Sequence, residues 1–320
     1  MLKKISTALA LCGLIATGAA QAQSNGPIHL VIAFPPGGPT DFVGRTISEE
    51  FSKQIKRNVI IDNKPGANGN IAGEFVARSA PDGNTLFFSS VGSIVINPSL
   101  YPKMPYDVPR DFAPVAQIVN NATILVVNSA SPFKTAVELV EASKKSKEPI
   151  ATASTGIGGM PHLAIETFID ASKANLLHVP YKGAAPAITD LLGQQVGAFF
   201  GDIPGLIGHI RGGKLRAIGI AGPKRSAVLP DVKTMAEQGY PSAEANNWYG
   251  IVAPAKVPAA TIAALNAALV KAVNEPGVHA KLVNSGAEPQ PSTPAELGAL
   301  MKKDTAKWAK IIKEKNIKAE

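Results

Sequence analysis

The sequence has little cysteine and few aromatic residues. Its one cysteine, Cys12, lies close to the amino terminus, and aromatic residues make up 6% of the 320 residues. A single thiol excludes an internal disulfide framework, so a chain of this size has to be stabilised by its hydrophobic cores. Nucleic-acid binding would require a basic surface with interleaved aromatics. The one basic cluster, over residues 144–147, is better interpreted as a solvated helix end, and we expect no nucleic-acid partner.

Recognisable catalytic motifs are missing as well. The chain has neither a G-x-S-x-G elbow nor a G-x-x-x-x-G-K-[ST] loop. A dinucleotide fingerprint would need Gly or Ala where Pro161 follows Gly156 and Gly158. The five histidines do not occur at metal-ligand spacing. We therefore predict no catalytic residue, no cofactor and no metal site, and an enzyme built from distant residues remains the alternative.

Long hydrophobic runs are absent beyond the first twenty residues. Lys3 and Lys4 precede an apolar stretch of about 16 residues, which is shorter than the roughly 20 residues that span a bilayer. Ala20-Gln21-Ala22 follows as an A-x-A cleavage site. This is the pattern of a secretory signal peptide, so we predict a signal peptide over residues 1–22 and export of a cysteine-free chain that begins near Gln23.

The remainder alternates strands and helices with short Gly/Pro connections, which is typical of an α/β fold with parallel sheets. Strands are predicted at residues 28–34, 58–62 and 85–89, with helices from about residue 40 and over residues 69–79. The pattern restarts after Pro114. There the predicted strands cover residues 124–128, 150–154, 178–181, 197–200 and 215–221. Capping boxes at residues 135–138 and 293–296 begin two helices, and a further helix covers residues 259–274.

Each half of the chain places a Gly-rich loop between an apolar strand and a helix. These loops cover residues 35–41 (PPGGPTD) and 154–162 (STGIGGMPH). Glycine lets backbone N–H groups approach a ligand, and a helix N-terminus favours an anion. Ligands of open parallel sheets bind at the carboxyl ends of the strands. Two facing loops would therefore form a cleft suited to a small anion, although each loop could also be a plain strand-to-helix turn.

Several polar residues near these loops have two interpretations. Asp41 either caps or supports the helix start, with Arg45 as an i,i+4 ion-pair partner, or contacts a ligand. His162 is either a packing group or a ligand contact. Lys182 follows a strand and either reaches the cleft or is solvated, and Asp202 ends a strand as a cleft group or a turn former.

An ordered set of segments resembles the Bug/TctC family of periplasmic substrate-binding proteins of tripartite tricarboxylate transporters. The match covers nearly all of the chain after the predicted signal. The segments are residues 32–41 (IAFPPGGPTD), 62–67 (DNKPGA), 81–83 (PDG), 97–98 (NP), 111–115 (DFAPV), 178–183 (HVPYKG), 190–193 (DLLG), 214–217 (KLRA), 229–231 (LPD) and 248–250 (WYG).

The resemblance implies a two-lobed periplasmic binding protein of type II (a Venus flytrap), each lobe a mainly parallel sheet flanked by helices. Residues 23–120 and 248–320 would form lobe 1, and residues 121–247 lobe 2, with crossings near residues 117–126 and 244–252. The two loops would hold a ligand carboxylate. The implied ligand-binding residues are Phe34, Pro36, Gly37, Gly38, Thr40, Asp41, Ser89, Ser90, Ser154, Thr155, Gly156, Gly158, Gly159, His162, Tyr181 and Asp202. Many members carry Ser or Thr where this chain has Gly159, so a relative's ligand cannot simply be transferred.

We therefore expect a periplasmic, monomeric receptor, and not an enzyme, for a di- or tricarboxylate, an aromatic acid or an amino acid. Its expected partners are this organic acid and the membrane permease components of a tripartite tricarboxylate transporter. A sensor of the same fold and, from another class, a secreted hydrolase are the alternatives.

Overall fold

The computed structural model describes residues 26–318 of the chain. The predicted signal peptide over residues 1–22, its cleavage site and the start near Gln23 lie outside the described residues. Within residues 26–318, none of the helices combines the length and the apolar character needed to cross a membrane.

The strands form a mixed, ten-stranded sheet in the order β2-β1-β3-β9-β4-β7-β5-β6, with β8 and β10 also paired to β4. β1 pairs in parallel with β2 and β3, and β5 in parallel with β6 and β7, whereas β4 and β9 run antiparallel to their neighbours. The strands are β1 (Ile28–Ile32), β2 (Val59–Asn63), β3 (Thr85–Ser90), β4 (Phe112–Asn128), β5 (Ile150–Ser154), β6 (Leu176–Pro180), β7 (Ala198–Asp202), β8 (Leu215–Ile220), β9 (Asn246–Pro254) and β10 (Ala287–Pro289). The predicted α/β class is confirmed.

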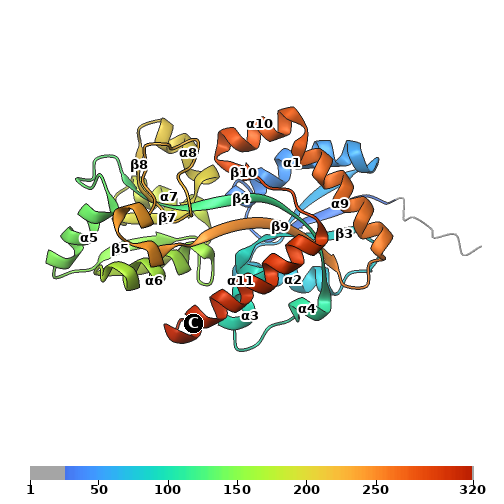
Figure 1. The fold of residues 1–320 in the computed structure, drawn as a ribbon, viewed down its shortest axis with the longest axis horizontal. Coiled ribbons are helices and arrows are strands. Elements are labelled where there is room, and N and C mark those ends of the chain that lie inside the picture. The colour runs from blue at the N-terminus through green and yellow to red at the C-terminus, as the bar shows by residue number, and fades with distance from the viewer. Residues whose placement is uncertain (1–25, 319–320) are drawn as a thin grey trace, which may run out of the picture.

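Helices flank the sheet in both halves of the molecule (Figure 1). They are α1 (Pro39–Ile55), α2 (Asn70–Ala77), α3 (Asn97–Leu100), α4 (Val108–Asp111), α5 (Ala136–Lys145), α6 (Met160–Ser172), α7 (Ala184–Leu192), α8 (Ile203–Arg211), α9 (Ala259–Asn274), α10 (Pro276–Ser285) and α11 (Pro294–Glu314). α1 and α9 pack together over an apolar core that includes Val43, Phe51 and Leu269.

The long strands β4 and β9 run side by side through the middle of the molecule (Figure 1). Residues 112–122 of β4 pair with β9, and residues 123–128 pair with β7 and β8. β4 thus joins the half that contains β1, β2 and β3 to the half that contains β5, β6 and β7. The division into lobes at residues 120 and 247 stays a prediction.

Most predicted elements are present, and the exceptions have local reasons. Pro114 does not end the pattern of the first half, because it lies inside β4 beside a register shift, where a strand tolerates a residue without an N–H. The capping box of α11 is complete. At α5, Thr135 accepts a hydrogen bond from the Glu138 N–H, but the Glu138 carboxylate accepts from Lys134. The helices α3, α4, α7, α8 and α10, the strands β9 and β10, and residues 112–123 of β4 were not predicted.

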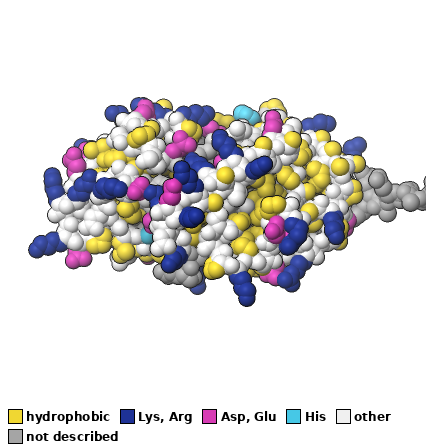
Figure 2. Space-filling model, turned by 60° about the horizontal axis from the view of Figure 1, so that its bottom comes forward, with side chains coloured by type: hydrophobic (Ala, Val, Ile, Leu, Met, Phe, Trp, Pro, Cys, Tyr) yellow, Lys and Arg dark blue, Asp and Glu magenta, His cyan; other side chains and the backbone are white. Residues whose placement is uncertain are grey.

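Charged side chains are mixed on the face of the molecule shown in Figure 2. Lys and Arg side chains lie there among Asp and Glu and beside apolar areas, and they do not gather into one stripe. The charged side chains on this face do not form the concentrated basic surface that is typical of nucleic-acid binding.

Candidate ligand-binding cleft

A cleft lies where the carboxyl ends of strands β1, β3, β5 and β7 meet. It encloses about 610 Å³ with its open mouth included. The lining consists of Phe34, Pro35, Pro36, Gly38, Pro39, Thr40, Ser90, Thr155, Gly159, Met160, Pro161, Lys182, Gly183, Ala184, Ala185, Pro186, Asp202, Asn247 and Tyr249. This placement follows the rule that open parallel sheets bind ligands beyond the carboxyl ends of their strands.

Four helices begin at this cleft. The residues that precede their first turns are Gly38 for α1, Gly159 for α6, Gly183 for α7 and Asp202 for α8, and all four line the cleft. No side chain caps any of these starts. The first N–H groups of a helix have no partner inside it and carry partial positive charge. The cleft therefore combines apolar walls with a field that favours an anion.

The first Gly-rich loop is held from behind by Asp41. Its buried carboxylate accepts hydrogen bonds from the Gly37 N–H, from Arg45 Nε and from Asn63 Nδ2, each at 2.9 Å. Burial raises the pKa of Asp41, but the bonds from Arg45, Gly37 and Asn63 outweigh it and lower the pKa below its usual value. The predicted ion pair with Arg45 is confirmed. Asp41 supports the loop, and its carboxylate does not line the cleft.

The second Gly-rich loop is held in a similar way by two histidines. Gly158 N–H donates to His162 Nδ1 at 3.2 Å, and Ser154 Oγ lies 2.6 Å from His178 Nε2. Ser154 Oγ also bonds the backbone of Gly156. Four of the loop residues, Thr155, Gly159, Met160 and Pro161, line the cleft. These hydrogen bonds hold the loop that supplies part of the cleft lining.

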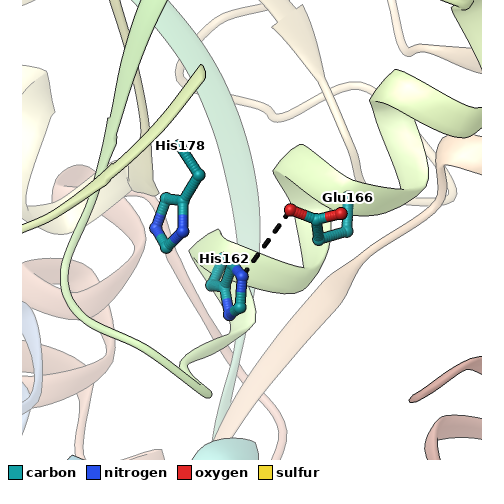
Figure 3. A group of neighbouring side chains, drawn as sticks. All are labelled: His162, Glu166 and His178. Carbon is teal, nitrogen blue, oxygen red and sulfur yellow. Dashed lines mark ion pairs between the residues drawn. The ribbon is translucent and has the colours of Figure 1, made fainter. Parts of the chain in front are cut away.

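Among residues 26–318, His162, Glu166 and His178 are grouped closely enough to hold a metal ion, with ligand atoms within 4.8 Å of one another (Figure 3). Their geometry argues against this use. His162 Nδ1 accepts a hydrogen bond, so in the neutral ring Nε2 carries the proton and has no lone pair for a metal. The rings of His162 and His178 also stack, with centroids 4.1 Å apart and planes at 15°. Lone pairs in such nearly parallel planes do not converge on one ion.

Asp202 lies at the inner end of the cleft. Its carboxylate accepts from Asn247 Nδ2 at 2.9 Å and from the Tyr249 hydroxyl, and Thr123 Oγ1 lies 3.4 Å away. Burial raises the pKa of Asp202 to about 6, although these three hydrogen bonds favour the charged form. The cleft thus has an acidic group at one end and the exposed Lys182 on its lining.

The structure brings half of the predicted ligand-binding residues to this cleft. Those on its lining are Phe34, Pro36, Gly38, Thr40, Ser90, Thr155, Gly159 and Asp202. Gly156 and Tyr181 line a neighbouring hollow of about 1080 Å³, which shares Phe34, Pro35, Thr155, Lys182 and Gly183 with the cleft. The remaining six do not line either space: Gly37, Asp41, Ser89, Ser154, Gly158 and His162. Their proposed contact with a ligand stays a prediction.

Sequence reasoning left out part of the lining. The segment over residues 183–186 begins α7 and resembles the two Gly-rich loops in being a glycine between a strand and a helix. The position of Gly183 between a strand and a helix could therefore have predicted this part of the lining. Asn247 and Tyr249 gave no such signal, because they reach the cleft only through the pairing of β9 with β4 and β3.

Comparison with known proteins agrees with this architecture. Residues 43–317 match the model of the tripartite tricarboxylate transporter family receptor. Protein BugT of Bordetella pertussis is 32% identical over 319 residues, which cover 99% of this chain and 98% of BugT. A solved R. palustris structure with adipate has a TM-score of 0.88 at 28% identity, covering 92% of this chain and 99% of that one. MatC from Rhodopseudomonas palustris with bound malate has a TM-score of 0.84 at 31% identity, covering 89% and 98%. The chain belongs to the tripartite tricarboxylate transporter receptor (TctC) family.

Proposed function

We propose that this protein is a periplasmic receptor that captures a small organic carboxylate in its cleft and delivers it to the membrane components of a tripartite tricarboxylate transporter. The observation that carries the proposal is the convergence of four uncapped helix starts on one largely apolar cleft. Backbone N–H groups at helix starts bind carboxylates well. The apolar wall from Phe34 and the prolines fits the carbon skeleton of an organic acid.

The two ends of the cleft differ in charge, which bears on the ligand. Near the starts of α1, α6 and α7 a carboxylate is favoured, whereas a second carboxylate beside ionised Asp202, at the start of α8, would be repelled unless one of the two is protonated. Related structures contain adipate and malate, two dicarboxylates. Di- and tricarboxylates, aromatic acids and amino acids therefore all belong in the first set of test ligands.

The family and the sequence also support proposals about catalysis, export, the two lobes and the oligomeric state. Receptor families of this kind bind solutes and do not transform them, so the chain is proposed not to be an enzyme. Residues 1–22 would direct export and be removed. Residues 23–120 with 248–320 and residues 121–247 would form the two lobes that close on the ligand, with the protein acting as a monomer.

A thermal-shift screen of the purified protein tests the ligand class. Adipate, malate, citrate, benzoate and aspartate are compared with glucose, a nucleotide and simple cations. A ligand present at about 1,000 times its Kd adds roughly 4 kcal/mol to the free energy of unfolding, so at least one acid should raise the melting temperature clearly. Stabilisation only by sugars, nucleotides or cations would overturn the carboxylate assignment.

A further inference from the structure

The loop over residues 154–159 is placed between two sets of contacts. Behind it lie the stacked imidazoles of His162 and His178, which hold Gly158 and Ser154 (Figure 3). His162 is buried, and its Nε2 lies 3.7 Å from Glu166 Oε1. In front of the loop, Thr155 and Gly159 face the cleft.

Gly158 itself meets the other half of the molecule. A β-carbon at this position would lie 2.5 Å from Leu100 Cδ2, 3.1 Å from Asn68 Nδ2 and 3.2 Å from Asn97 Oδ1. Gly158 also has a φ of +80°, which a residue with a side chain rarely adopts. The position of Gly158 therefore sets how closely the second loop approaches the segment around Asn68, which lines the hollow beside the cleft.

The proton on His162 has a defined place in this arrangement. Because Gly158 donates to Nδ1, the neutral ring carries its proton on Nε2, which is directed toward Glu166. Proximity to His162 lowers the pKa of Glu166, so the acceptor is ionised. The other charged or titratable groups around it are His178 from β6 and Lys315 beyond α11, which pairs with Asp170. The negative charge of Glu166, 3.7 Å from Nε2, favours the tautomer with its proton on Nε2, which accepts from Gly158.

We propose that His162 is a positioning residue for ligand capture: its Nδ1 accepts from the Gly158 N–H and so fixes Gly158 and thereby the cleft-lining Thr155 and Gly159. The imidazole does not touch the ligand, and the Gly158 N–H is not available to it. This inference rests on the proposed function, because it names the contact that holds the second loop in the position where it lines the cleft for the acid.

Two substitutions of His162 separate this role from simple packing. His162→Asn keeps an acceptor oxygen where Nδ1 lies, whereas His162→Gln places its amide where Nε2 lies, and both remove the stacking on His178. Hydrogen exchange of the Gly158 amide is measured without ligand, and affinity is measured by calorimetry with adipate and with malate. We expect Gly158 protection and affinity close to wild type for the Asn variant. The Gln variant should show exchange faster by at least about tenfold and binding weaker by a similar factor, since a buried donor left without a partner is costly.

The outcomes distinguish the inference from the proposed function. If the Asn and Gln variants have the same Gly158 exchange, or the same affinity, the acceptor at Nδ1 has no positioning role. If wild type binds none of the acids while Gly158 exchange still separates the variants, the carboxylate assignment fails and the loop contact stands by itself. If both variants fail to fold, the imidazole ¹⁵N chemical shifts of His162 in the wild type decide: a neutral ring with its proton on Nδ1 would overturn the proposal.

Discussion

The hydroxyl of Tyr249 donates a hydrogen bond to Oδ2 of Asp202, the same oxygen that accepts from Asn247. This bond ties the end of β7 to the central strand β9 at the floor of the cleft. Asp202 has no cationic side chain among its hydrogen-bond partners, which are Thr123, Asn247 and Tyr249. Burial raises the pKa of Asp202, and the hydrogen bonds from these neutral donors offset only part of that rise.

Asp202→Asn should change how stability depends on pH. The pKa of Asp202 is raised from 3.8 to about 6 on folding, so the stability linked to its protonation is complete below about pH 4 and lost as the pH rises through about 6. The difference corresponds to about 3 kcal/mol at 1.36 kcal/mol per pH unit. The Asn variant should therefore gain up to this amount relative to wild type between pH 4 and pH 8. Urea unfolding across that range measures it, and parallel profiles would contradict a buried, uncompensated carboxylate.

His178→Gln tests a linkage of the opposite sign. Burial, with a smaller contribution from His162, lowers the pKa of His178 from 6.5 to about 4. The stability that this gives is present above pH 6.5 and lost as the pH falls through about 4. The Gln variant keeps an amide near Ser154 and removes the titration, so it should lose less stability than wild type on acidification. Exposed His279→Gln is the control. An acid response in the Gln variant as steep as in wild type would count against neutral His178.

Gly37→Ala and Gly158→Ala form a matched pair. Both glycines have φ near +80°, so each alanine should cost about 1–2 kcal/mol of stability. A β-carbon at Gly37 would meet no atom within 4 Å, whereas at Gly158 it would contact Leu100. We expect only Gly158→Ala to weaken capture of the acid, by about tenfold or more, in calorimetric titration. Equal loss of binding in Gly37→Ala would place Gly37 at the ligand.

Lys182→Gln should slow the association of an anionic ligand. Lys182 is exposed and supplies the cationic side chain on the cleft lining. Screening weakens such a charge as salt rises, so association should be several-fold slower than in wild type at about 10 mM salt and nearly equal at about 0.5 M. Stopped-flow mixing measures the rates, with Lys144→Gln at the end of α5 as the control. A defect that persists unchanged at high salt would indicate a direct contact instead of steering.

The sequence by itself determined the α/β class and many of the elements. Apolar runs, turn residues and capping boxes predicted β1, α1, β5, α6 and α9 because these features act over one or two turns of chain. The motif set implied the family and its fold, and the Gly-rich loops indicated an anion site at strand ends. Asp41 and Arg45 could be paired from their spacing alone, since i,i+4 residues of a helix are neighbours.

Only the tertiary structure decided which groups of these loops face the cleft. Local sequence cannot show that the Gly158 N–H donates to His162 or that the Gly37 N–H donates to Asp41. It also cannot show that α7 and α8 begin at the same cleft as α1 and α6. Nor can it bring Tyr249 to Asp202 across 47 residues of chain. These relationships depend on strand pairing through β4 and β9, whose register is fixed by the packing of both halves rather than by any short segment.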